Sequence, residues 1–176
     1  MALPDSFRTA QGTAIVWGDA GGSGVTNTMT LDALADGSAR MGAEADLGAT
    51  FYQRYAVYLY VETGTAPAAG VTVELYLAWS LDGTFYPAGV TGSDGAWPSD
   101  GNEDEWAKQL ELVGSLVATA DGNTQQGQGP WIVYAKGRYV VPVVDNNLAQ
   151  AFRDQATASN NLSRVIMIPL DDQVID

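Results

Sequence analysis

The residues that decide the fold lie between Tyr55 and Ser80, where two runs follow each other along the chain, Tyr55–Glu62 (YAVYLYVE) and Val71–Ser80 (VTVELYLAWS). Both runs are rich in β-branched and aromatic residues, and apolar positions alternate with more polar ones, which is typical of strands with one buried face. A loop bounded by Gly64 and Gly70 separates them. The sequence therefore predicts a β-hairpin.

The alternation also predicts which face of each strand is buried, because successive side chains of a strand point to opposite faces. The face expected to join the core carries Val57, Leu59, Val61, Val73, Leu75, Leu77 and Trp79. The opposite face carries Tyr58, Tyr60, Glu74 and Tyr76. Isolated domains seldom leave a large aromatic patch open without a use, so we expect Tyr58, Tyr60 and Tyr76 to be covered by protein, as interface residues.

The rest of the chain repeats this strand pattern. Strand-like runs are found at Gly12–Trp17, Asn27–Leu31, Ser38–Met41, Leu110–Ala118, Trp131–Ala135, Arg138–Val144 and Arg164–Leu170. Asp-Gly turn signals separate many of them, at Asp36, Asp82, Asp94, Asp100 and Asp121. Many short strands with glycine-rich turns predict an all-β fold, a jelly-roll-like antiparallel β-sandwich with long Gly/Asp-rich loops.

A few segments do not look like strands. Glu103–Lys108 and Leu148–Ala156 are each long enough for about two helical turns and are expected to be connections. Ala88–Trp106 and Ala120–Pro130 are expected to be long loops, which in compact domains are usually functional or mobile.

A chain of 176 residues fits a single domain, which we place at residues 12–176. Residues 1–11 are predicted to be an N-terminal arm used in assembly, with Leu3 and Phe7 as apolar anchors and Arg8 as a positive charge. No basic region followed by an apolar run is seen at the start, and the longest apolar stretches are far too short to span a bilayer. We therefore expect a soluble protein without a signal peptide that does not bind membranes.

The composition excludes several classes of function. With 21 acidic and 8 basic residues the formal net charge is −13, which disfavours nucleic-acid binding because that needs clustered Lys and Arg. The chain has no Cys and no His, which removes thiol nucleophiles, Ser-His-Asp triads and His-ligated metals. We expect no catalytic residues, no enzymatic activity and no cofactor.

One acidic loop resembles a calcium-binding pattern. Asp100, Asn102 and Asp104 stand at positions 1, 3 and 5 of an EF-hand loop, and Glu111 stands at position 12. Glu105 occupies the sixth position, where the loop needs a glycine for its sharp turn. A solvated acidic loop is therefore the favoured interpretation, and calcium held by a sandwich loop is the alternative.

Two glutamates form a candidate carboxylate pair for sugar chemistry. Glu62 and Glu74 could lie near each other across the predicted hairpin, beside the tyrosines, which would suit a sugar platform. A paired-strand surface is flat, however, so hydrolysis is not expected, and sugar binding remains an alternative.

Two prolines bear on the position of the last strands. Tyr139–Val144 and Val165–Leu170 have no clear alternation, which indicates strands covered on both faces. Pro142 and Pro169 each lack a backbone donor, which favours edge strands. Edge strands covered by a neighbouring chain would satisfy both observations.

The C-terminal third of the chain resembles a known group of proteins. Gly137–Asn146 (GRYVVPVVDN), Gln150–Phe152, Ser163–Leu170 (SRVIMIPL) and the acidic end resemble the closing strands of small virion structural proteins from tailed bacteriophages, and Trp79–Gly83 (WSLDG) is similar to a hairpin of the same group. Within that group the chain looks most like a capsid decoration, or cement, protein.

The resemblance implies a non-enzymatic β-sandwich that binds the outside of the capsid shell and stabilises it. Its partners would be the major capsid protein or other virion proteins, its location the virion, and its state a homo-oligomer or multicopy assembly, with no active site and no cofactor. Two alternatives stay open: a tail or head-tail adaptor component, and, from another class, a carbohydrate-binding β-sandwich module.

Overall fold

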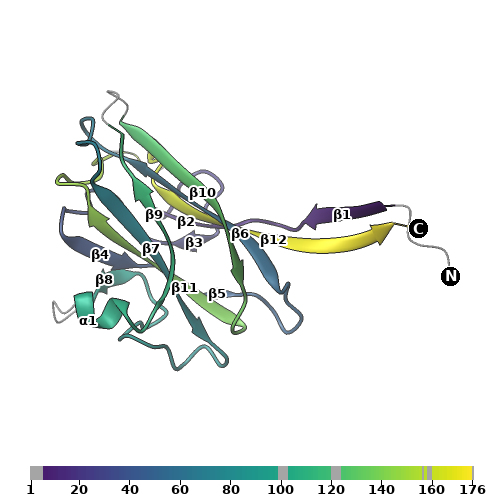
Figure 1. Cartoon of the computed structure of the whole chain (residues 1–176). Coiled ribbons are helices and arrows are strands. Elements are labelled where there is room, and N and C mark those ends of the chain that lie inside the picture. The colour runs from purple at the N-terminus through teal and green to yellow at the C-terminus, as the bar shows by residue number, and fades with distance from the viewer. Residues whose placement is uncertain (1–5, 99–102, 120–123, 156, 158–159, 176) are drawn as a thin grey trace.

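The computed structural model describes residues 6–98, 103–119, 124–155, 157 and 160–175, and for residues 6–11, 103–104 and 171–175 the backbone alone. These residues form two six-stranded sheets that face each other, and the strands cross the body of the molecule as two layers (Figure 1). The all-β sandwich predicted from the sequence is confirmed.

The two sheets, named sheet A and sheet B, take strands from all parts of the chain. Sheet A contains β1 (Ser6–Gln11), β2 (Ile15–Gly18), β3 (Asn27–Thr28), β6 (Arg54–Glu62), β10 (Gln125–Tyr134) and β12 (Arg164–Ile175). Sheet B contains β4 (Ser38–Met41), β5 (Ala45–Asp46), β7 (Thr72–Ser80), β8 (Gly95–Trp97), β9 (Glu111–Val117) and β11 (Tyr139–Asn147). The short helix α1 (Glu103–Ala107) lies between β8 and β9.

Sheet A has the order β10-β6-β12-β2-β3, with β1 paired to the far end of β12, and sheet B has the order β8-β4-β11-β7-β9, with β5 paired to β11. Nearly every connection between the longer strands passes from one sheet to the other; β7 to β9 stays in sheet B. Longer strands that follow each other along the chain therefore mostly lie in opposite sheets, as in a β-sandwich.

The core lies between the sheets, where the inner side chains of β6 and β7 are almost completely buried. The predicted core face was therefore right for Val57, Leu59, Val61, Val73, Leu75 and Leu77. The predicted hairpin was wrong, because β6 lies in sheet A between β10 and β12, whereas β7 lies in sheet B between β11 and β9. Alternation gives each strand one apolar face whether the next strand is its neighbour or lies across the core, so it cannot separate the two cases.

The prediction that the proline-containing strands are edge strands was also wrong, since β11 and β12 are central strands of their sheets. Pro142 accepts a hydrogen bond from Gly42 N–H at 2.9 Å, so its backbone is directed to the gap between β4 and β5. Pro169 accepts one from Gly12 N–H at 3.0 Å and is directed to the gap between β1 and β2. In both cases the missing N–H falls where the neighbouring strand is interrupted, so no regular ladder bond is lost.

Three predicted connections differ from the expectation. Ala120–Pro130, expected as a long loop, contains the first residues of β10, from Gln125 onward. Leu148–Ala156 contains no helix in its described residues and instead forms a bridge between Thr63 and Phe152. Ala88–Trp106, expected as a loop, contains β8, which pairs with β4. The predicted helical connection at Glu103–Lys108 is present as α1. None of the helices formed by the described residues reaches the length and apolar character of a membrane span.

Candidate binding surface

The outer faces of the two sheets differ in what covers them. On sheet B, Tyr76, Ala78, Val141 and Val143 are buried under a second hydrophobic cluster. The chain between β7 and β9 supplies the cover through Ala88, Val90 and Trp97, with Tyr86, Trp106 and Leu110 at its margin. The indole N–H of Trp97 is bonded to the carbonyl of Ala88 at 2.7 Å, which fixes this layer to itself. The outer face of sheet B is therefore covered over β4, β7 and β11.

The outer face of sheet A, defined here by the outward residues of β6, β10 and β12 together with Leu162, has no such cover among the described residues. Its large side chains are partly open to solvent: Tyr134 is 63% exposed, Ile132 50%, Tyr60 41% and Leu162 39%. The register carries the apolar character across the strands, since Ile132 is paired with Ala56 and Ala56 with Ile168. The outer face of sheet A is therefore apolar and partly open to solvent.

The charges on this face are few and mainly positive, although the whole chain carries −13. Arg164 pairs with Tyr60, and Arg54 pairs with Leu170 and Tyr134. Glu62 is the one acidic residue among the described outward positions of these strands, and its side chain is buried, with Arg153 at 2.7 Å. An apolar face with a basic edge is complementary to an apolar surface with an acidic rim.

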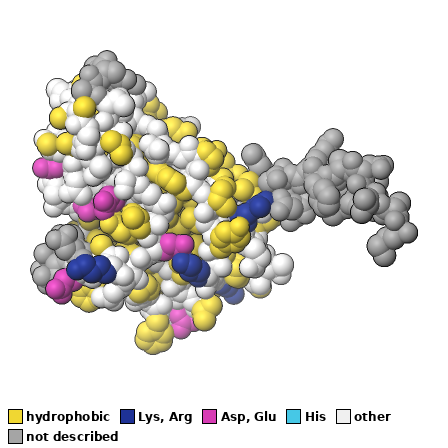
Figure 2. Space-filling view, viewed as in Figure 1, with side chains coloured by type: hydrophobic (Ala, Val, Ile, Leu, Met, Phe, Trp, Pro, Cys, Tyr) yellow, Lys and Arg dark blue, Asp and Glu magenta, His cyan; other side chains and the backbone are white. Residues whose placement is uncertain are grey.

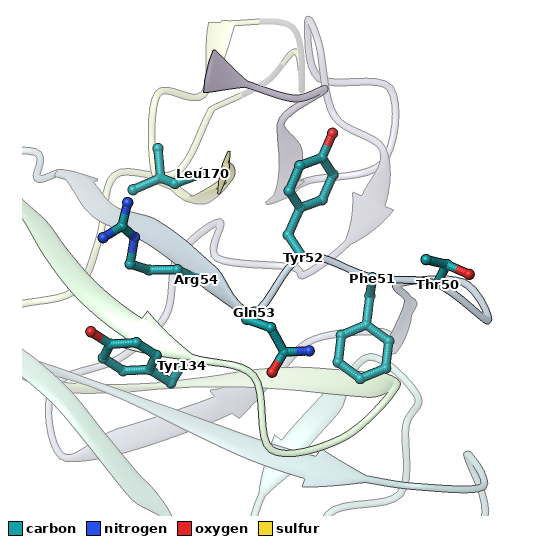
Figure 3. Close-up of a pocket in the computed structure, with 7 residues that line it drawn as sticks. All are labelled: Thr50, Phe51, Tyr52, Gln53, Arg54, Tyr134 and Leu170. Carbon is teal, nitrogen blue, oxygen red and sulfur yellow. The ribbon is translucent and has the colours of Figure 1, made fainter. Parts of the chain in front are cut away.

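An open depression of about 610 Å³ lies at one end of this face, lined by Thr50, Phe51, Tyr52, Gln53, Arg54, Tyr134 and Leu170. Figure 3 shows the Arg54 side chain between Leu170 and Tyr134, while the Tyr52 ring lies apart from these three side chains. A smaller depression of about 280 Å³ lies at the opposite end and includes Tyr60, Leu162 and Ile166. The face therefore has concave ends that can receive side chains of a partner.

The chain termini form a ribbon next to the larger depression. β1 pairs antiparallel with the end of β12, from Gln11 opposite Leu170 to Ser6 opposite Ile175. The ribbon projects away from the sandwich (Figure 1), and Figure 2 shows hydrophobic side chains gathered near its base. We define the projecting ribbon as residues 6–11 and 171–175.

The predicted interface residues are divided among three places. Tyr58 and Tyr60 lie on the outer face of sheet A, with stacked rings 6.4 Å apart, whereas Tyr76 is buried on the outer face of sheet B. The three tyrosines therefore do not share one face, because their strands belong to different sheets. Phe7 and Arg8 lie in the projecting ribbon, at positions paired with Val174 and Gln173. The last predicted residue, Leu3, lies outside the described residues.

The carboxylate pair considered for sugar chemistry is not formed. Glu62 in sheet A is bonded by Arg153 and, at 3.2 Å, by Gln155. Glu74 in sheet B accepts a hydrogen bond from the hydroxyl of Tyr76. The prediction that they could lie near each other depended on the hairpin and was wrong with it.

The residues of the predicted calcium pattern are only partly described. Asp100 and Asn102 lie outside the described residues. Asp104 lies in α1, and only its backbone is described. Glu111 lies in β9, where its carboxylate accepts the indole N–H of Trp79 at 2.6 Å and contacts the ammonium of Lys136 at 3.0 Å. In the described part of the chain, no three or more Asp or Glu residues gather as a metal-binding group.

Two further carboxylates fix loops to the sheets. Asp94, before β8, is held by both the guanidinium of Arg40 and the backbone and hydroxyl of Thr30. Burial acts to raise the pKa of Asp94, but the bonds from Arg40 and Thr30 outweigh it and lower the pKa below its usual value. Asp19 is buried beside Asn161 and Asp32, and burial raises its pKa. These contacts serve the architecture and lie away from the outer face of sheet A.

Two exposed apolar side chains lie elsewhere, on the turn after β7. Leu81 and Phe85 are almost fully exposed. The Asp82 carboxylate accepts the N–H groups of Thr84 and Phe85, at 2.9 and 3.1 Å, and these bonds lower its pKa. The turn is held by these bonds, but it offers two isolated side chains and no continuous face.

No family model matches this chain, and comparison with curated proteins and with solved structures finds no match either. Sequence reasoning did not identify Ile132, Tyr134, Tyr52 or Leu162 as surface residues. The sequence contains only a weak signal for this surface. Ile132 and Tyr134 alternate with Trp131 and Val133, which indicates two different faces of the strand, but alternation does not show which of the two faces stays exposed.

Proposed function

We propose that this protein is a non-enzymatic structural protein that binds another protein surface through the outer face of sheet A. The observation that carries the proposal is the difference between the two sheets: the described residues cover most of the outer face of sheet B and leave that of sheet A partly open. Large exposed apolar patches on soluble domains usually mark interaction sites.

The more specific proposal is a phage capsid decoration protein, which binds the outside of the shell and stabilises it. It is supported by the resemblance of the strands β11 and β12 to virion structural proteins and by the all-β sandwich, which is compatible with the jelly-roll architecture of viral capsid and lectin domains. Fold alone does not establish function, so the docking face carries the argument. A tail or head-tail component would use the same face on a different partner.

The experiment that tests the virion role is sedimentation of a cleared phage lysate on a sucrose gradient. The proposal expects the chain to co-sediment with full capsids at high copy number. Co-sedimentation with isolated tails would favour the tail component, and a chain that stays at the top of the gradient would contradict both virion proposals.

One observation favours a second candidate, binding of neutral glycans. The 610 Å³ depression combines two exposed aromatic rings, Tyr52 and Tyr134, with the polar side chains of Thr50 and Gln53. Rings that stack on sugar faces next to amide and hydroxyl groups are the common elements of sugar sites. Titration with a glycan panel, followed by tyrosine chemical shifts, would show a saturable change that is lost in Tyr134→Ala if this candidate is right.

A further inference from the structure

The projecting ribbon leaves an edge of β12 without a strand beside it. From Arg164 to Leu170, β12 is paired with β6, and this pairing ends where β6 begins, at Arg54 opposite Leu170. From Asp171 to Ile175, β12 keeps β1 on one side, and no strand of the described residues lies on the other. Residues 171–175 are therefore paired on one edge and open on the opposite edge.

The backbone groups on the open edge can be assigned. In a strand, successive residues direct their N–H and C=O groups to opposite sides. Pro169 is directed toward β1 and β2, since its carbonyl accepts the N–H of Gly12 at 3.0 Å. Counting in steps of two, Asp171, Gln173 and Ile175 also face β1. Asp172 and Val174 therefore direct their N–H and C=O groups to the open edge.

A ribbon of this kind is unfavourable by itself. Two strands alone are marginally stable in water, and three or more strands are normally needed for independent stability. An unpaired strand edge is also a template for pairing with another chain. The ribbon extends beyond the sandwich that would otherwise support it (Figure 1).

We propose that the occupant of this edge is a second copy of the same chain. The two β12 strands would pair antiparallel about a two-fold axis at Gln173, giving a four-stranded sheet in the order β1-β12-β12-β1. Asp172 of each copy would then lie opposite Val174 of the other, and their N–H and C=O groups would form four hydrogen bonds across the axis. The interface is isologous, so it closes as a dimer.

The sequence of the edge and the shape of the molecule both favour self-pairing. In this register Asp171 and Asp172 lie opposite Ile175 and Val174, so neither carboxylate residue is directly opposite its own counterpart. Because the ribbon projects, the two acidic sandwich bodies, which belong to chains of net charge −13 each, lie at opposite ends of the dimer. Residual repulsion between them should be screened by salt, so the dimer should strengthen as ionic strength rises.

The absence of cysteine from the chain makes disulfide trapping a direct test. At the axis, residue 173 of each copy forms a non-hydrogen-bonded pair with Cα atoms about 4.5 Å apart, which a disulfide can bridge. In the control, residue 175 lies opposite residue 171, so its own counterpart is about 13 Å away along the strand, too far for a disulfide. The full-length variants Gln173→Cys and Ile175→Cys would be oxidised gently at equal concentration.

We expect a cross-linked dimer to form readily with Gln173→Cys and at least tenfold more slowly with Ile175→Cys. Sedimentation of the unmodified chain should show a monomer–dimer equilibrium. In Val174→Pro the N–H on the open edge is lost while the β1 ladder is kept, so the variant should be monomeric. In the matched Val174→Thr the donor is retained, so the variant should still dimerise.

Three results would each overturn the proposal: equal cross-linking of the two cysteine variants, a native chain that is monomeric at every concentration and salt level, or a Val174→Pro variant that dimerises like the native chain. The inference does not rest on the virion role. A chain that dimerises but never sediments with capsids would leave it standing while the proposed function fails.

Discussion

Replacing Asp94 by asparagine measures how far one ionic contact holds the outer layer of sheet B in place. Both carboxylate oxygens of Asp94 accept hydrogen bonds. Nε and Nη2 of Arg40 donate at 2.7 Å each, and the backbone N–H and the hydroxyl of Thr30 donate at 3.0 and 2.6 Å. The side chains of Arg40 and Asp94 are 25% and 17% exposed. The substitution removes the charge and leaves the guanidinium of Arg40 without its partner.

The expected size of the effect follows from this partial burial. Exposed ion pairs contribute at most about 1 kcal/mol, and breaking a fully buried pair costs about 3 to 5 kcal/mol, so we expect Asp94→Asn to lower the free energy of unfolding by about 2 to 4 kcal/mol. In a domain of this size that corresponds to a fall in Tm of about 4 to 16 °C. Thermal unfolding followed by circular dichroism measures it.

The chain supplies a matched control in Asp46, which forms the same two-bond contact with Arg138, with both bonds at 2.6 Å. This pair lies at the surface, and the hydrogen bonds from Arg138 lower the pKa of Asp46 to about 2. Asp46→Asn should change Tm little, because solvent screens an exposed pair. If the two variants lose the same stability, partial burial of the Asp94 pair is not what makes it strong, and the reasoning is refuted.

The pH dependence provides an independent check on Asp94. The bonds from Arg40 and Thr30 hold its pKa in the folded state below the unfolded value of about 3.9. Its contribution is therefore complete above that value and is lost as the pH falls through the lower, folded pKa. The difference in Tm between the native chain and Asp94→Asn should shrink below about pH 4. A difference that stays constant down to pH 2 contradicts this assignment.

Three other predictions follow from separate features. A Cβ at Gly114 would lie 2.3 Å from the Trp131 ring, whereas one at Gly64 would meet nothing within 4 Å, so Gly114→Ala should cost about 1 to 3 kcal/mol in chemical denaturation and Gly64→Ala much less; equal effects would contradict the packing argument. Chelation of divalent ions should shift Tm little, because Glu105 replaces the turn glycine of the predicted calcium loop; a fall of about 10 °C would mean that the loop binds metal. Deleting residues 1–11 should leave Tm within a few degrees and abolish self-association measured by sedimentation; a truncated chain that still dimerises would show that β1 is not needed.

The sequence was sufficient to predict what depends on short-range pattern. The buried faces of β6 and β7 were predicted correctly, because alternation reports burial on one side of a strand. The bounds of Ser38–Met41 were also predicted correctly. The neighbouring strands of β6 and β7 were not predicted correctly. A connection that passes from one sheet to the other leaves the same alternation in the flanking strands as a hairpin turn does.

The candidate surface was harder to predict, because it is defined by what covers each sheet. The chain between β7 and β9 was expected to be mostly loop, but it covers Tyr76 through Trp97 and its neighbours. Nothing in that segment's own pattern shows that it lies on sheet B and leaves Tyr60 and Ile132 on sheet A uncovered. The ribbon could not be predicted from local pattern either, because it pairs residues near the two ends of the chain, such as Ser6 with Ile175.

The central claim, docking through the outer face of sheet A, can be tested with one pair of variants. Ile132 on sheet A is 50% exposed, and Leu112 at the edge of sheet B is 54% exposed. Replacing either residue by aspartate introduces the same charge at nearly the same exposure, so the two variants should be equally well folded. Binding of each to full capsids would be measured by co-sedimentation across a range of concentrations.

We expect Ile132→Asp to bind capsids at least about tenfold more weakly than the native chain, a loss of about 1.4 kcal/mol, because a carboxylate would have to be buried in the interface. Leu112→Asp should bind like the native chain. The opposite pattern, with Leu112→Asp defective and Ile132→Asp unaffected, or equal binding by both, would contradict the assignment of the docking face to sheet A.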